Sequence, residues 1–209
     1  MSKTLLLLLL PFAAAATISR DSLERLLHTP EDSPACLSEQ ERFQYCFEHF
    51  EEDYGTVYET HGFAVLANQT LMQSFFDDLA GGSRCIGETT CKSTSFYKWI
   101  VDTLVFAGNH IYGESFDCFA EESLHEKLLN CVGTYSLFTN SASDLEDAHI
   151  IARCTAHRLG SVCSVRDRND FIKAAYAVID IVEQVKEKKW ETRTENMHFD
   201  ATDYDNIFW

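Results

Sequence analysis

The sequence predicts an all-α protein, a bundle of about six helices that disulfide bonds staple together. Three observations carry this prediction. The 209-residue chain has eight cysteines, an even number, behind an apolar leader. From residue 36 onward, apolar residues recur at spacings of three and four, the period of an amphipathic helix. All three prolines precede the first cysteine, and a long proline-free sequence favours helices over a turn-rich β sandwich.

Residues 1–16 are expected to form a cleaved signal peptide. The basic residue Lys3 precedes an apolar run at residues 5–10, and the small residues 13–16 follow. This order is typical of a secretory signal, and the run is shorter than the roughly 20 residues of a membrane span. We predict cleavage after Ala16, a secreted, extracellular protein and no membrane span.

The rest of the chain divides into three segments. Residues 17–35 are a polar entry segment, and residues 36–189 form the cysteine-rich helical domain. Residues 190–209 form an acidic tail without a helical period, which we expect to be disordered, with docking elsewhere on the protein as the alternative. The net charge of −16 excludes nucleic acid as a partner, because two anionic surfaces repel each other.

The helices of the domain are placed by their caps and their apolar faces. A capping box at residues 38–41 is expected to begin the first helix, and Gly81 and Gly82 are expected to end the second. A further capping box marks residue 143, and Gly160 marks the end of that helix. The later helices are expected at residues 69–80, about 96–111, 116–131, 143–159 and about 169–189.

Asn68 begins the sequon Asn68-Gln69-Thr70, which predicts N-glycosylation in a secreted chain. On a helix, position 68 would share a face with Leu71 and Phe75, where a glycan could not be buried. We therefore expect the helix to begin at Asn68, with the Asn68 side chain as its N-cap. The alternative is a sequon that is not used.

The cysteines are expected to pair as disulfides in an oxidising compartment. If one helix carries Cys36 and Cys46, they lie about 15 Å apart and should each bond to another partner. The short polar loop between Cys85 and Cys91 favours a bond between those two, and the other pairings stay open. The full set is Cys36, Cys46, Cys85, Cys91, Cys118, Cys131, Cys154 and Cys163.

The sequence contains no motif that fits a known type of catalytic site. An even cysteine set argues against thiolate catalysis, the cysteine spacings do not suit zinc, and nucleophile-elbow and phosphate-loop patterns are missing. We predict a protein that is not an enzyme and has no cofactor or metal. A secreted hydrolase of unrecognised type is the alternative, with His125 and Glu122, or His149 and Asp147, as its candidate pairs.

The chain is rich in aromatic residues, with 15 Phe, 8 Tyr and 3 Trp. Five of them could line an apolar pocket, with a packed core as the alternative. These are Phe96, Trp99, Phe106, Phe116 and Phe119. We therefore predict a non-enzymatic protein that binds an apolar small molecule or an extracellular protein, with a structural or host-interaction glycoprotein as a further alternative.

The cysteine pattern resembles that of a known family. Residues 115–119 read S-F-D-C-F, residues 128–132 read L-L-N-C-V, and two further cysteines precede a long amphipathic helix. This arrangement resembles the secreted nematode proteins of the Domain of Unknown Function 19 family, and it is similar to the insect 27-kilodalton haemolymph glycoproteins. The nematode proteins carry a further cysteine before the position of Phe116, which this chain lacks. The resemblance implies a secreted disulfide-bonded fold and no catalytic residues.

Overall fold

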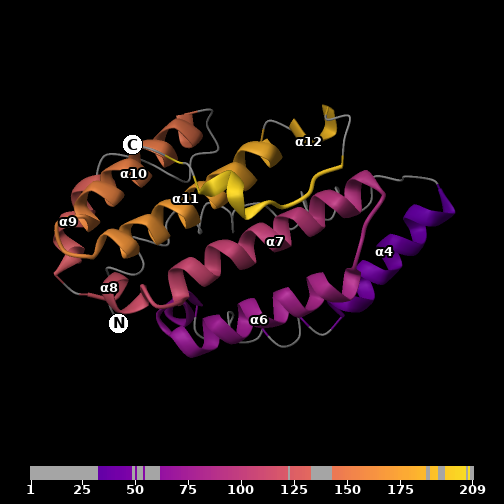
Figure 1. Cartoon of the computed structure of the whole chain (residues 1–209), viewed down its shortest axis with the longest axis horizontal. Coiled ribbons are helices and arrows are strands. Elements are labelled where there is room, and N and C mark those ends of the chain that lie inside the picture. The colour runs from indigo at the N-terminus through magenta and orange to yellow at the C-terminus, as the bar shows by residue number, and fades with distance from the viewer. Residues whose placement is uncertain are drawn as a thin grey trace.

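Long helices form the framework of the protein, as a computed structural model shows (Figure 1). The predicted signal peptide and most of the entry segment lie outside the described residues. The structure describes residues 33–48, 50, 54, 62–121, 123–132, 143–186, 189–192, 196–205 and 207.

The described residues contain helices and no strand, which confirms the all-α fold class and the stapled helical bundle. Among these helices, none is long and apolar enough to cross a membrane. The elements are α4 (Pro34–Cys46), η1 (Gly62–Ala67), α6 (Gln69–Ile86), α7 (Lys92–Tyr112), α8 (Phe116–Phe119), α9 (Leu124–Val132), α10 (Ser143–Leu159), α11 (Val165–Lys186), α12 (Lys189–Thr192) and η2 (Ala201–Tyr204).

Helix α7 lies at the centre of the bundle, with α6 along one side and α11 along the other (Figure 1). Helix α10 packs on α11, α9 packs on α10, and α4 contacts α6 and α7 at the opposite end of the molecule. The main core lies between these helices, and Ile111, Phe119 and Leu159 are fully buried in it. Burial of such apolar side chains is the main stabilising contribution to the fold.

The first helix begins earlier than the sequence suggested. Ser33 caps α4, because its Oγ accepts a hydrogen bond of 3.2 Å from the Cys36 N–H, and Pro34 occupies the first helical position. The predicted capping box at residues 38–41 is therefore wrong, since these residues lie inside the helix.

The two glycines at 81 and 82 do not end the second helix, which continues to Ile86. Gly82 is buried, and a Cβ atom there would lie 2.3 Å from the ring of Phe47. A glycine is thus required at position 82 by the close packing of α4 against α6, and the expectation of a helix stop was wrong.

Two further helix boundaries differ from the prediction. The segment 116–131 is interrupted after Phe119 and forms α8 and α9. Helix α11 begins at Val165, four residues before the predicted start, because Ser164 and Asp167 form a reciprocal cap. The Asp167 N–H donates to Ser164 Oγ at 3.2 Å, and the Ser164 N–H donates to Asp167 Oδ2 at 2.9 Å.

The described part of the acidic tail is ordered and packs on the bundle, so the predicted disorder is wrong there and the docking alternative holds. Trp190, Met197 and Tyr204 are each at most 7% exposed. The Trp190 ring stacks on Phe96 with centroids 4.6 Å apart. The Tyr204 hydroxyl donates to Asp180 of α11 at 3.0 Å, which ties η2 to that helix.

Candidate functional site

All eight cysteines form disulfides, and none is free. The prediction that Cys36 and Cys46 bond to other partners is confirmed, and the predicted Cys85–Cys91 bond is wrong. Cys85 lies in the last turn of α6, and four residues separate that helix from Cys91, so each cysteine faces a different end of α4. The pairs are Cys36–Cys91, Cys46–Cys85, Cys118–Cys163 and Cys131–Cys154.

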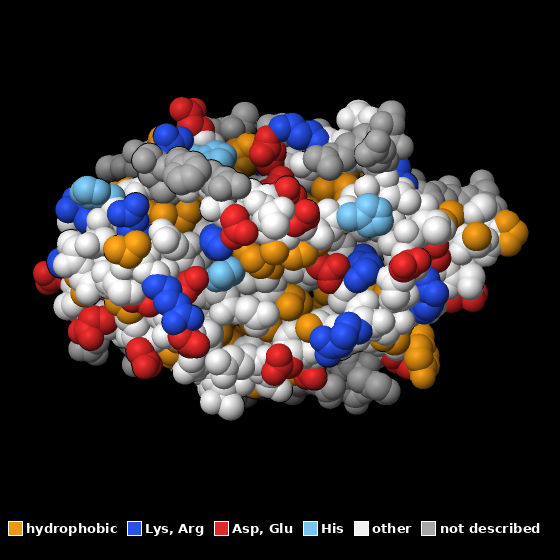
Figure 2. Space-filling model, in the orientation of Figure 1, with side chains coloured by type: hydrophobic (Ala, Val, Ile, Leu, Met, Phe, Trp, Pro, Cys, Tyr) orange, Lys and Arg blue, Asp and Glu red, His pale blue; other side chains and the backbone are white. Residues whose placement is uncertain are grey.

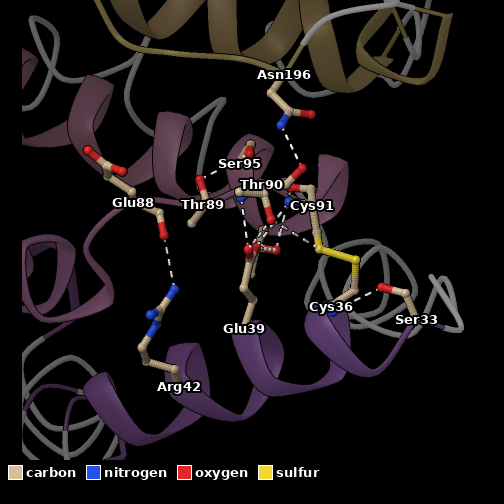
Figure 3. The surroundings of a disulfide bond; sticks show 11 residues. Ser33, Cys36, Glu39, Arg42, Glu88, Thr89, Thr90, Cys91, Ser95 and Asn196 are labelled. Carbon is tan, nitrogen blue, oxygen red and sulfur yellow. Dashed lines mark hydrogen bonds between the residues drawn. A yellow bond between two sulfur atoms is a disulfide. The ribbon is translucent and has the colours of Figure 1, made fainter.

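Beside the Cys36–Cys91 bond, the carboxylate of Glu39 reaches from α4 to the start of α7 (Figure 3). Glu39 Oε1 accepts from the Thr90 N–H at 2.8 Å and from the Thr90 hydroxyl at 2.6 Å. Glu39 Oε2 accepts from the Cys91 N–H at 3.1 Å and from the Thr94 hydroxyl at 2.8 Å. An acidic side chain at a helix N-terminus is stabilising, so Glu39 caps α7 from a different helix.

Glu39 is a buried residue, with only 8% of its surface exposed. Burial raises its pKa, but the hydrogen bonds from Thr90, Thr94 and Cys91 together outweigh burial and hold the pKa below its ordinary value of 4.5. The geometry is that of a structural anion with all its acceptors in use. Glu39 therefore belongs to the framework and offers no proton for catalysis.

Asn68 lies on the surface and caps α6, as the sequence predicted. Its Oδ1 accepts a hydrogen bond of 3.1 Å from the Leu71 N–H. An N-linked glycan is carried by the side-chain nitrogen, which this bond leaves unused. The exposed position and the capping geometry are therefore both compatible with a glycan.

The five aromatic residues proposed for an apolar pocket do not come together. Phe96 and Trp99 lie in a small cluster with Trp190, whereas Phe116 and Phe119 lie in the main core. Phe106 is half-buried between them and contacts Phe199 of the tail, with centroids 5.4 Å apart. The alternative of a packed core therefore describes these residues, and the predicted pocket is wrong.

The hydrolase pairs gain no support from the described residues. Glu122 and the side chain of His125 lie outside them. His149 contacts the ring of Tyr176 with centroids 5.3 Å apart, and burial, with the nearby Arg153 cation, lowers the pKa of His149. Asp147 is two residues from His149 on α10, and residues at that spacing do not face each other.

A serine, an aspartate and a histidine do meet at another point, which the sequence analysis missed. His110 Nδ1 lies 2.9 Å from Asp170 Oδ1, and the Ser115 hydroxyl donates to Asp170 Oδ2 at 2.5 Å. In a catalytic triad the histidine stands between the serine and the acid. Here the aspartate occupies the middle, so the serine has no base, and the cluster joins α7 to α11.

One group of three potential metal ligands occurs among the described residues, formed by Cys118, Cys163 and Asp167. The two sulfur atoms are bonded to each other, so neither is a thiolate that could bind a metal. The acidic group that remains is engaged in the cap of α11.

An open cleft of about 660 Å³ lies between the first half of α11 and residues 204–207, and it is the largest cavity that we describe. Its lining mixes charge and apolar surface. Val165, which is 75% exposed, borders it together with Ile172. Arg166 pairs with Glu114, and Lys173 pairs with Asp205. Figure 2 shows that, on the side of the molecule drawn there, acidic and basic side chains lie around hydrophobic ones.

The cleft could not be located from the sequence, because one of its walls comes from the tail, through Tyr204, Asp205 and Ile207. The aromatic residues scattered through that tail were the local signal for docking, but its charge and missing helical period favoured disorder instead. Comparison with models of known protein families, with characterised proteins and with solved structures found no match for this chain. The resemblance to nematode and insect secreted proteins therefore stays a prediction.

Proposed function

We propose that the protein is secreted and binds an extracellular protein partner at the cleft beside α11. Four disulfides support an oxidising compartment, since such bonds persist there and are rare in the cytosol. The lining of the cleft indicates a protein as the partner. The serine–aspartate–histidine cluster does not have the geometry of a catalytic triad, which favours binding over hydrolysis.

The observation that carries the proposal is the lining of the cleft. Sites for apolar small molecules are enclosed and mostly hydrophobic. This cleft is open, it has ion pairs at Arg166 and Lys173, and it exposes Val165 at its edge. Reversible protein interfaces combine an apolar centre with a polar rim, and the exposed Val165 beside the two ion pairs offers both kinds of group. A protein segment therefore suits the cleft better than the apolar ligand that the sequence also allowed.

Photo-crosslinking from the cleft tests the proposal. The photoreactive amino acid p-benzoylphenylalanine is placed at Val165, and at Asp77 on the exposed face of α6 as the matched control. Each secreted, disulfide-bonded protein is irradiated in the extracellular fluid in which the protein occurs. We expect one discrete protein adduct from position 165 that position 77 does not give, and a Lys173→Glu change in the position-165 protein should weaken it.

The apolar-ligand alternative predicts a different result. Native mass spectrometry of the secreted protein would then show a bound small molecule, and no adduct would be specific to position 165. Identical adducts from positions 165 and 77 would also contradict the proposal, because they would report contact without a defined site.

A further inference from the structure

We infer that a small pocket between α10 and α11 is a binding site for a sulfate- or phosphate-type anion. The pocket has a volume of about 90 Å³ and is lined by Arg153, Ala156, His157 and Arg168. This volume is well below the 300 Å³ or more of sites for drug-sized ligands and suits a single ion or ester group. The inference does not rest on the proposed partner, because only Arg168 of these four residues also borders the cleft.

The arrangement of donors argues for a tetrahedral anion. Arg153 and His157 are one helical turn apart on α10 and share a face with the buried Ala156, while Arg168 approaches from α11. Arginine offers only donors, and a histidine ring donates at least one N–H in either neutral or charged form. Donors from two helices match an anion with acceptors on several sides better than the two coplanar oxygens of a carboxylate.

The charge of the pocket is unusual for this chain. The whole protein carries a net charge of −16, yet among the described residues those that line the pocket include two arginines and no acid. The acidic residues nearest to Arg168 along α11 are engaged elsewhere: Asp167 in the helix cap, and Asp170 with His110 and Ser115. Arg153 also forms a side-chain hydrogen bond with Tyr176, so an anion would share this guanidinium group with the protein.

The protein does not fully engage the guanidinium group of Arg168. Its Nε atom is buried and has no hydrogen-bond partner within the described part of the chain. It does not serve as a cap for α10, because backbone N–H groups of residues 160–163 already donate to the carbonyls of Ala156, Arg158 and Leu159. Because the Nε atom itself is closed to solvent, an anion in the pocket would bind the part of the Arg168 side chain that lines the pocket, and the Nε–H resonance would report that contact from the same group.

Titration with sodium sulfate and sodium phosphate tests the site, with sodium chloride keeping the ionic strength constant. The full, disulfide-bonded protein is labelled with ¹⁵N, and the arginine Nε–H resonances are followed by NMR. We expect one arginine resonance, absent from an Arg168→Met variant, to shift and saturate with either anion. Calorimetry should show at least about tenfold weaker binding for Arg168→Met, the equivalent of 1.4 kcal/mol or more.

Two further variants make the result decisive. Arg84→Met removes the same charge from an exposed position on α6 and should change the affinity less than about twofold. His157→Gln alters an exposed lining residue, so it leaves the core intact and should weaken binding about threefold or more, even if Arg168→Met fails to fold. A sulfate monoester that binds as well as the free ion identifies a group carried by a larger molecule, whereas binding of the free ion alone identifies the ion itself.

The inference is overturned if the shifts rise linearly and equally with chloride, or if Arg84→Met weakens binding as much as the pocket variants. It is also overturned if the saturating resonance persists in Arg168→Met and the affinity of His157→Gln is unchanged. The first two results would reflect general attraction between anions and surface cations, and the third would place the anion elsewhere.

Discussion

The carboxylate of Glu39 is the most connected side chain that we describe, and replacing it with glutamine should destabilise the protein. The glutamine carbonyl oxygen can still accept from Thr90, but the amide group that replaces the other carboxylate oxygen cannot accept from Cys91 or Thr94. A buried backbone donor without an acceptor costs about 1–3 kcal/mol, and the remaining bonds lose the strengthening by charge. We therefore expect Glu39→Gln to lower the free energy of unfolding by about 3 kcal/mol.

Urea unfolding with the disulfides intact measures this change. With a slope of about 2 kcal/mol per molar urea, the midpoint should fall by about 1.5 M. Glu41→Gln is the matched control, because Glu41 lies on the same helix, is exposed and can change the free energy by no more than about 0.5 kcal/mol. Equal midpoints for Glu39→Gln and Glu41→Gln would refute the assigned role of Glu39.

The pH dependence gives a second check on the same carboxylate. The pKa of Glu39 is lower in the folded protein than its ordinary value of 4.5 in an unfolded chain, so the charged form contributes stability above about that pH. This contribution is lost as the pH falls through the lowered pKa. The difference in unfolding free energy between the wild type and Glu39→Gln should therefore be largest near neutral pH and shrink below pH 4.5. A difference that stays constant with acid would contradict the reasoning.

Substitutions at four further positions test the packing and the cap of α6. Gly108→Ala should lower the free energy of unfolding by about 1–3 kcal/mol, because the new Cβ would lie 2.4 Å from the buried ring of Phe76, whereas Gly81→Ala should raise it by about 0.5–1 kcal/mol; urea unfolding in which Gly108→Ala is the more stable of the two variants would refute this. Trp190→Ala should cost about 3–5 kcal/mol and lose its near-ultraviolet circular dichroism, and an unchanged midpoint would mean that the tail does not dock. Asn68→Asp should abolish any glycan but keep the cap, and Asn68→Ala should cost about 1 kcal/mol more, as deglycosylation and thermal unfolding will show.

Features that depend on a few neighbouring residues could be predicted from the sequence. Asn68 was placed as a cap because the sequon and the apolar face of the following helix conflict unless the helix begins there. The helix 143–159 was placed by its own capping box and by Gly160, and the structure has the same bounds. Each of these decisions involves contacts within one or two helical turns, which the sequence order reveals directly.

Features that depend on contacts between distant segments could not be predicted in the same way. Gly82 looked like a helix stop, since a glycine that ends a helix and one that admits a neighbouring ring have the same letter. Glu39 looked like part of a local capping box, whereas it caps a helix more than 50 residues away. In both positions the residue type was informative, but the partner that gives it meaning lies on another element.

The disulfide pairing is the case in which more could have been inferred. Each half of the chain contains one pair inside another: Cys46–Cys85 within Cys36–Cys91, and Cys131–Cys154 within Cys118–Cys163. Two antiparallel segments bring residues together in this nested order, because moving forward along one segment means moving backward along the other. Short connections between successive helices predict antiparallel neighbours, so a nested pattern was the arrangement to test first.

Different contacts hold the walls of the two proposed sites. No disulfide joins the half before residue 92 to the half after residue 117, and among the described residues the packing of α7 on α11, the His110–Asp170 cluster and the docked tail connect them. The anion pocket lies wholly within the second half, between α10 and α11, which are held together by their packing, while the Cys131–Cys154 bond ties α10 to α9. The cleft has one wall on the tail, which is held by the Tyr204–Asp180 hydrogen bond and the Lys173–Asp205 ion pair. Because polar contacts of this kind open at a lower cost than the packing between long helices, we expect the tail wall of the cleft to move more readily than the walls of the anion pocket.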